Sequence, residues 1–260
     1  MIIKRNSWYW PAERERMLHI YLPDDYDQSD ERYPVMYFFD GHNLFYNEDA
    51  TYGKSWGLKE FLDTWAKKMI IVGMECSHEG YARLSEYNPY NRRWGKTYVK
   101  GIGDQTFQWI LQEIKPMIDS EYRTCPFREA TGIAGSSMGG VMAVYGVLKY
   151  NEYFSKSAAV SGGFFYNLSH YRKTLSESSL SPDTRLYMSW GEQEAGNAAR
   201  NGNNEYDTRE ARAARKFSDE LKTAGIDTQV YFQPQGRHCE EDWEKQVPLF
   251  MNYLWCDQRL

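Results

Sequence analysis

Short apolar segments alternate with polar stretches along the whole chain, and this pattern predicts the order of secondary structure. Continuous apolar runs at 34–39 and 69–74 indicate strands that are buried on both faces, which is typical of a parallel sheet. Residues 7–22 alternate more loosely and predict two antiparallel strands at a sheet edge. Further strands are expected at 129–134, 155–161, 185–191 and 228–232.

Helical spacing of apolar residues appears between these strands. It predicts helices at 56–68, 97–120, 141–148, 206–224 and 240–256, with a helical or irregular segment at 164–175 and a polar loop at 195–204. Strands that alternate with helices predict an α/β fold, with a mainly parallel central sheet, helices on both faces and antiparallel N-terminal strands. The 260 residues show no repeat, linker or break in composition, so a single domain over 1–260 is expected.

A G-x-S-x-G motif, with Gly135 and Gly139 on either side of Ser137, stands between a predicted strand and a predicted helix. That context is typical of a nucleophile elbow, in which a strained turn exposes the serine hydroxyl above the sheet. The glycines are needed because strand and helix pass so closely that a Cβ would clash. The motif therefore predicts a nucleophilic serine, which needs a histidine base and an orienting acid.

Candidates for both partners follow later predicted strands. Glu192 and Glu194 come after the strand that ends near Trp190, and His238 follows the last strand. The order serine, acid, histidine is the order of the α/β-hydrolase triad. We expect His238 to be the base and Glu194 to be the acid, because Glu194 reaches further past its strand, although Glu192 remains an alternative.

Two backbone N–H groups are expected to form an oxyanion hole. One belongs to Met138, which follows the nucleophile, and the other to His42, in the loop after the strand at 34–39. Gly41 would let that backbone approach the substrate. The His42 ring is a weaker candidate for the base, because it precedes the serine in the chain.

These residues predict acyl transfer. His238 would take the Ser137 proton as the hydroxyl attacks an ester carbonyl, and Glu194 would hold the imidazole in the required tautomer. Water would then cleave the acyl-enzyme, and no metal or organic cofactor is required. Around His78, the carboxylates of Glu75 and Glu79 resemble a metal site, but without a further ligand at a useful spacing a solvated polar loop is expected.

The chain also resembles a known family, the Putative esterase family of α/β hydrolases, which includes feruloyl esterases, enterochelin-esterase-like proteins, S-formylglutathione hydrolase and mycolyltransferases. The matching pieces span nearly the whole chain: 33–35 with 40–41, 83–89, 135–140, Gly191 with Glu194, and 236–238 with Trp243. The resemblance implies a single α/β-hydrolase domain and carboxylic ester hydrolysis. It carries over Ser137 and His238 as nucleophile and base, and favours Glu194 over Glu192.

The composition of the chain limits which binding partners and which cellular location are expected. A net charge of −5 gives no nucleic-acid footprint, and the apolar runs are too short to span a bilayer. Without a basic and then apolar leader at the N-terminus, and with four scattered cysteines read as free thiols, a cytoplasmic protein is expected. Aromatic residues reach 16%, which would suit a stacking surface for sugars or aryl groups, an aromatic core or a homodimer interface.

The favoured hypothesis is a serine esterase that acts on a small or carbohydrate-linked ester. An acyltransferase, in which an alcohol replaces water, is an alternative on the same fold. A third possibility is a non-catalytic binding protein, which the presence of Ser137, His238 and the acidic pair argues against, since a binding module needs none of them.

Overall fold

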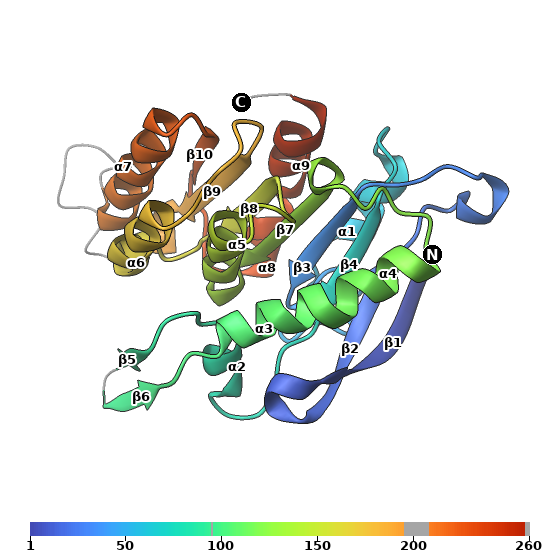
Figure 1. The fold of residues 1–260 in the computed structure, drawn as a ribbon, viewed down its shortest axis with the longest axis horizontal. Helices are drawn as coiled ribbons and strands as arrows, with labels where there is room; N and C mark the ends of the chain where they lie inside the picture. The colour runs from blue at the N-terminus through green and yellow to red at the C-terminus, as the bar shows by residue number, and fades with distance from the viewer. Residues whose placement is uncertain (95, 195–207, 258–260) are drawn as a thin grey trace. The chain divides into compact units, whose positions relative to one another are not determined.

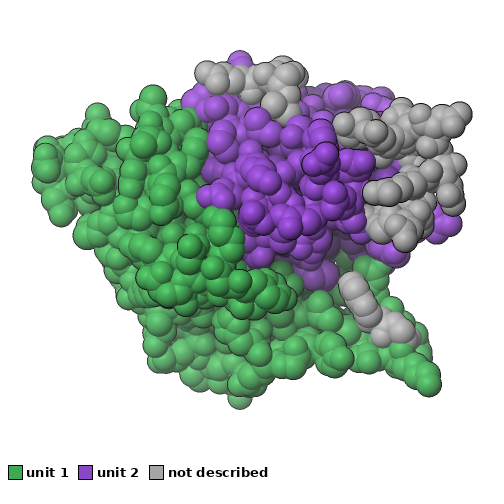
Figure 2. Space-filling model, turned by 180° about the vertical axis from the view of Figure 1, so that it is seen from behind, with its two compact units in different colours: residues 1–132 green, residues 133–260 purple. Residues whose placement is uncertain are grey.

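The computed structural model describes residues 1–94, 96–194 and 208–257. The chain divides into two compact units, residues 1–132 and 133–260, which Figure 2 colours separately. Strands and helices alternate within both (Figure 1). The single domain expected over 1–260 stays a prediction.

Unit 1 carries four neighbouring strands in the order β1-β2-β4-β3. The antiparallel edge pair is confirmed, since β1 (Ile2–Tyr9) pairs with β2 (Arg14–Tyr21), although it begins earlier than predicted. β2 pairs antiparallel with β4 (Ile70–Met74), and β4 pairs parallel with β3 (Val35–Phe39). Every residue of β3 and β4 is buried, which explains their continuous apolar sequences.

The helices of unit 1 differ more from their predicted bounds. They are α1 (Leu58–Thr64), α2 (Ala82–Glu86), α3 (Gly103–Trp109) and α4 (Lys115–Glu121), with a π-helical segment at Ile110–Ile114 joining the last two. The helix predicted from residue 97 begins at Gly103 instead. Residues Thr97–Val99 form β6, which pairs with β5 (Arg92–Trp94). A β-branched and aromatic triplet favours a strand over a helix.

Unit 2 contains strands that lie side by side in the order β7-β8-β9-β10. Their bounds are β7 (Thr131–Ser136, which begins at the end of unit 1), β8 (Lys156–Val160), β9 (Arg185–Gly191) and β10 (Asp227–Gln233). β8 is parallel to β9, and β9 is parallel to β10. These strands agree closely with the predicted ones. Their carboxyl ends therefore lie along one edge, where α/β folds place their ligands.

In the part of unit 2 that the structure describes, the α-helices are α5 (Met138–Lys149), α6 (Phe164–Ser176), α7 (Arg209–Thr223), α8 (Glu240–Glu244) and α9 (Val247–Cys256). α5 packs on β8, α7 on β10 and α9 on β9. The single helix predicted over 240–256 is wrong. Pro248 lies in the first turn of α9 and has no N–H to continue α8, so two helices form. The loop predicted at 195–204 lies outside the described residues.

Three features of the composition can be compared with the structure. Among the described ranges, no helix is long and apolar enough to cross a membrane. All four cysteines are free, as expected. Much of the aromatic surplus lies in the interior, where Trp109, Tyr171 and Tyr253 are among the largest fully buried side chains.

Two arginines on β2 form ion pairs in contrasting environments. Arg16 pairs with Glu86 of α2, and only 7% and 4% of these side chains are exposed. The second Glu86 oxygen accepts a hydrogen bond from the Ser77 backbone at 2.9 Å. Arg14 pairs with Glu79 at 2.6 Å, but these side chains are 41% and 76% exposed. The strand is thus tied to α2 by a buried ion pair, and to Glu79, in the segment before α2, by a solvated one.

Replacing Arg16 by methionine leaves the Glu86 carboxylate buried without its cation. We expect Arg16→Met to lower the free energy of unfolding by about 3–5 kcal/mol. Arg14→Met is the matched control and should change stability little, because solvent screens its ion pair. Urea unfolding followed by circular dichroism measures both variants, and equal losses would contradict this account of the buried pair.

Candidate active site

Ser137 occupies the sharp turn between β7 and α5. Its φ is 55° and its ψ is −121°, a backbone conformation that non-glycine residues rarely adopt. A Cβ built on Gly135 would lie 2.6 Å from the Gly139 carbonyl carbon, so strand and helix do pass too closely for a side chain there. The Ser137 N–H donates to the Val160 carbonyl of β8 at 2.9 Å, which fixes the turn. The local geometry is that of a nucleophile elbow.

Glu194 and His238 meet beyond the ends of β9 and β10. His238 Nδ1 lies 2.7 Å from Glu194 Oε2, and only 2% of the Glu194 side chain is exposed, against 42% for His238. An ionised carboxylate can only accept, so Nδ1 carries the proton and Nε2 of the neutral ring is left as an acceptor. Glu192, the alternative acid, instead accepts a hydrogen bond from the Gln235 backbone at 2.7 Å. The structure therefore brings Glu194, and not Glu192, to the histidine.

Sequence reasoning assigned no role to Ser161, which contacts this acid, or to the Trp243 side chain, which contacts Ser161. Ser161, directly after β8, donates its hydroxyl to Glu194 Oε1 at 2.6 Å, and Trp243 Nε1 donates to the Ser161 oxygen at 3.0 Å. The Trp243 ring also meets the His238 ring edge-on, with centroids 4.9 Å apart. Ser161 has a φ of 52°. Small residues after a parallel strand were the available signal, but the hydroxyl's partner lies 33 residues further along the chain.

A chain of contacts links the serine turn to the histidine. The Ser137 backbone N–H is hydrogen-bonded to Val160, which precedes Ser161 in the chain. The Ser161 hydroxyl is hydrogen-bonded to Glu194, and Glu194 is hydrogen-bonded to His238. The loops after β9 and β10 also touch, because a Cβ on Gly191 would lie 2.4 Å from the Gly236 oxygen. Ser137 and the Glu194–His238 pair thus both lie at the carboxyl ends of the unit 2 strands, joined through Val160 and Ser161.

Met138, the first predicted oxyanion donor, is the first residue of α5. The first N–H groups of a helix have no partner within the helix and point outward from its N-terminal end. The helix dipole adds a partial positive charge at the same place. This position suits a group that must bind a developing oxyanion.

His42 lies in unit 1, in a short 3-10 turn over Gly41–Asn43 that follows β3. A Cβ on Gly41 would lie 2.4 Å from the Gly73 carbonyl carbon, so only glycine fits. The His42 ring contacts Thr51 Oγ1 through Nε2 at 2.9 Å, while its buried Nδ1 has no hydrogen-bond partner within the described ranges. Burial lowers the pKa of the ring, and the nearby Asp40 charge offsets this only partly. No carboxylate among the described residues orients this ring, unlike that of His238.

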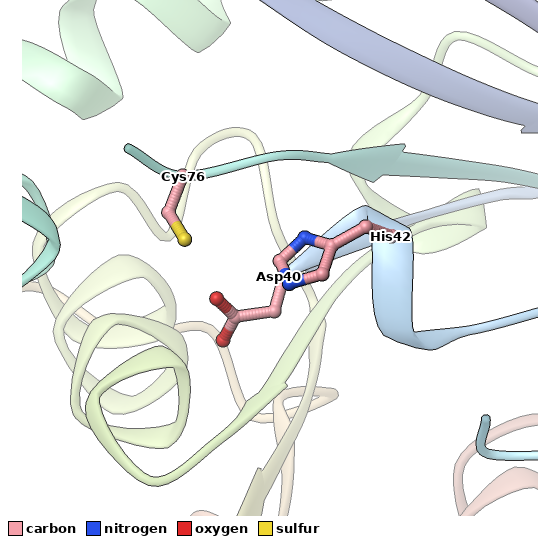
Figure 3. Close-up of side chains that lie close together, drawn as sticks. All are labelled: Asp40, His42 and Cys76. Carbon is pink, nitrogen blue, oxygen red and sulfur yellow. The ribbon is translucent and has the colours of Figure 1, made fainter. Parts of the chain in front are cut away.

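Asp40 begins the same turn and is held tightly. Both of its oxygens accept from Arg83, at 2.8 and 2.7 Å, and its backbone N–H donates to the Tyr87 hydroxyl at 3.1 Å. Burial by itself would raise the pKa of the Asp40 carboxyl, but the Arg83 guanidinium outweighs burial and holds it below its ordinary value. Figure 3 shows Asp40 beside His42 and Cys76. This ion pair positions the turn that carries His42.

A family model described as Putative esterase matches residues 11–250. The chain belongs to this family. Membership confirms the resemblance on which the carry-over of residues rests. It also makes the chain a carboxylic ester hydrolase at the level of reaction class.

Individual relatives agree with the family. The Uncharacterized protein YbbA of Bacillus subtilis strain 168 is 28% identical over 185 residues, which is 69% of either chain. Esterase MT1326 of Mycobacterium tuberculosis is 28% identical over 171 residues, 62% of this chain and 34% of that protein. A solved structure of an IroE-like serine hydrolase from Shewanella oneidensis matches with a TM-score of 0.71 at 21% identity, over 95% of this chain and 80% of the other. This likeness confirms the predicted α/β-hydrolase fold.

Ser161 offers a test of how the acid is held. In Ser161→Ala, the Glu194 carboxylate loses the hydrogen bond that the serine hydroxyl donates to it, and we expect kcat/KM for p-nitrophenyl acetate to fall about tenfold or more, with KM little changed. Alanine is as strained as serine at this positive φ, so the substitution removes only the hydroxyl.

Ser157→Ala is the matched control. Ser157 lies on β8, four residues before Ser161, and its buried hydroxyl donates to the Ala143 carbonyl of α5 at 2.9 Å. This variant should lose about 1 kcal/mol of stability and keep its activity. A Ser161→Ala enzyme that is as active as wild type would show that the Ser161 hydroxyl does not position the acid.

Proposed function

We propose that the chain is a serine carboxylic-ester hydrolase that works through an acyl-enzyme, with Ser137 as nucleophile, His238 as base and Glu194 as acid. One observation carries the proposal: a buried carboxylate, Glu194, contacts Nδ1 of His238 at 2.7 Å, in the unit where Ser137 stands on a strained elbow. A strained residue at a conspicuous turn points toward function, because folding alone gains nothing from it.

The steps follow from the protonation of the histidine. Since Nδ1 carries a proton for Glu194, Nε2 takes the proton of the Ser137 hydroxyl as the oxygen attacks the ester carbonyl. The tetrahedral intermediate collapses, the carbon–oxygen bond of the ester breaks, and His238 gives its proton to the departing alcohol. Water, deprotonated by the same nitrogen, then attacks the acyl-enzyme and releases the acid and the free serine.

The oxyanion of each intermediate needs donors that are already in place. We assign this role to the N–H groups of Met138, at the start of α5, and of His42, in the turn after β3. The order of these segments in the chain supports the assignment. Such a donor typically contributes about 3 kcal/mol to transition-state stabilisation.

For the substrate we propose a small or carbohydrate-linked ester. Two exposed aromatic side chains support this choice: Phe165 and Tyr166 are 42% and 64% exposed on the first turn of α6. That helix begins three residues after Ser161, so its first turn lies close in sequence to the residue that holds the acid. Aromatic faces at such a place suit the apolar face of a sugar or an aryl group.

Removing members of the triad tests the mechanism. We expect Ser137→Ala and His238→Ala each to lower kcat/KM for p-nitrophenyl butyrate by at least about 10³-fold, and Glu194→Ala by about 10²-fold or more. Glu192→Ala is the matched control and should stay within about threefold of wild type, because its carboxylate contacts Gln235 instead.

A covalent readout complements the rates. A p-nitrophenyl phosphonate should label wild type once, on the peptide that contains Ser137, and should leave Ser137→Ala unlabelled. Labelling at another residue, or full activity of Ser137→Ala, would exclude the serine mechanism. An inert Glu192→Ala with an active Glu194→Ala would exchange the roles of the two acids.

The proposed carbohydrate preference rests on Tyr166 and can be tested by itself. Tyr166→Ala should raise KM for an acetylated sugar by about two- to tenfold and leave kcat unchanged, because a stacking contact is lost while the reacting groups stay in place. Hydrolysis of p-nitrophenyl acetate should not change. Tyr153→Ala, another exposed tyrosine of unit 2, is the control, and equal effects in both variants would remove the argument for this surface.

A further inference from the structure

Three potential metal ligands meet in unit 1. His42 comes from the turn after β3, while Glu75 and His78 come from the segment after β4. One donor atom from each lies within 4.8 Å of the other two. His78 Nε2 is 3.5 Å from Glu75 Oε2, and the His42 and His78 rings meet edge-on with centroids 4.6 Å apart. Two imidazoles and a carboxylate therefore converge on one point.

One nitrogen of the buried His42 ring is unsatisfied among the described residues. The residue is 4% exposed, and its Nδ1 is buried with no hydrogen-bond partner in the described part of the chain. A buried polar atom without a partner is costly, and a ligand would remove that cost. The other ring nitrogen, Nε2, lies 2.9 Å from Thr51 Oγ1, so the ring orientation is already fixed. Figure 3 shows the His42 ring near Asp40 and Cys76, and Cys76 directly follows Glu75 in the chain.

The two carboxylate oxygens of Glu75 have different surroundings. Its Oε1 accepts a hydrogen bond from His19 Nε2 at 2.7 Å, and the His19 side chain is only 3% exposed. Its Oε2 faces His78 at 3.5 Å. In many metal sites an outer group holds one side of a ligand in this way and directs the other side to the metal.

We propose that His42 Nδ1, Glu75 and His78 Nε2 form a binding site for a divalent transition metal ion, with Zn²⁺ as its representative. Two histidines and one glutamate are a known donor set for zinc, with a fourth position left to water. Tetrahedral zinc at these bond lengths places its ligand atoms roughly 3.3 Å apart, close to the Glu75–His78 separation of 3.5 Å. Because 56% of the His78 side chain is exposed, an ion can enter and the ring can adjust.

A second grouping, Asp40 with His42 and Cys76, also has donor atoms within 4.8 Å of one another. It fits a cation less well. Arg83 already occupies both Asp40 oxygens, and a metal there would face the guanidinium charge at close range. Among the described residues, Glu75 forms ion-pair contacts with the His19 and His78 rings, and His19 contacts only one of its oxygens.

The sequence alone showed only part of this site. Around His78 it offers Glu75 and Glu79, and without a further ligand at a useful spacing it predicts a solvated loop. The structure turns Glu79 away to Arg14, at 2.6 Å, and supplies His42 from 36 positions earlier in the chain, a ligand that spacing could not reveal.

Isothermal titration with ZnSO₄ tests the proposal on the full chain freed of metal by chelation. Wild type should bind one Zn²⁺ with a micromolar or tighter Kd, and Co²⁺ should give a visible d–d absorption that Zn²⁺ abolishes. His78→Ala and Glu75→Gln should each bind at least about tenfold more weakly. His78 is exposed, so its variant should keep the wild-type circular dichroism.

Two histidine variants serve as controls. His170→Ala removes a ring of α6 in the other unit and should bind as wild type does. His238→Ala should also keep its affinity, which separates this site from zinc captured by the proposed triad. The proposal is overturned if wild type does not bind Zn²⁺, if His78→Ala and Glu75→Gln bind as tightly as wild type, or if the loss appears in His238→Ala instead.

Discussion

A buried carboxylate is the constraint on which the candidate active site depends. Only 2% of the Glu194 side chain is exposed, so its oxygens must find donors inside the protein. Three donors are present: the His238 ring, the Ser161 hydroxyl and the Gly191 N–H, all at 2.9 Å or less. They come from the ends of β8 and β9 and from the loop after β10, so one anion ties three strand ends together. The contact with Glu194 favours the histidine tautomer in which Nδ1 carries the proton and Nε2 is an acceptor.

Strain accompanies this arrangement. Ser137 and Ser161 both have positive φ angles, 55° and 52°, at the ends of the neighbouring strands β7 and β8. Each such residue costs on the order of 1–3 kcal/mol and persists only where its surroundings hold it. Backbone hydrogen bonds do so here, from Ser137 to Val160 at 2.9 Å and from Ser161 to Ser189 at 3.0 Å. At Ser161 the strained backbone accompanies a hydroxyl that donates to the acid.

Most of the fold could be predicted from the sequence because its strands are buried on both faces and its turns require glycine. β3, β4 and β9 show this most clearly, as does the elbow at Ser137. Helix ends were less predictable, because they depend on local breaks such as Pro248 and on competition with strand pairing at Thr97–Val99. Chain order and the resemblance singled out Glu194, and its contact with His238 agrees with that choice.

Sequence patterns do not identify residues whose contacts lie far away in the chain. Ser161 shows no motif, and its importance appears only when Glu194 and Trp243 are seen against its hydroxyl. His42 was chosen for its backbone N–H, yet its ring turned out to be buried with one nitrogen unpartnered. Periodicity and spacing describe neighbours along the chain, and these contacts are made across it.

The two carboxylates near His42 show how the number of partners decides what an acidic side chain can do. Asp40 meets a bidentate arginine, so its charge is balanced and both oxygens are occupied; it can position a turn but has nothing left to offer a ligand. Glu75 meets a single histidine on one oxygen and keeps the other facing a second ring. Its pKa lies below the ordinary value although burial opposes this, because the His19 hydrogen bond and the surrounding histidines favour the anion. Glu75, with one oxygen in a hydrogen bond and the other facing a second ring, is suited to binding a cation. Asp40, with both oxygens paired to Arg83, is suited to holding the backbone in place.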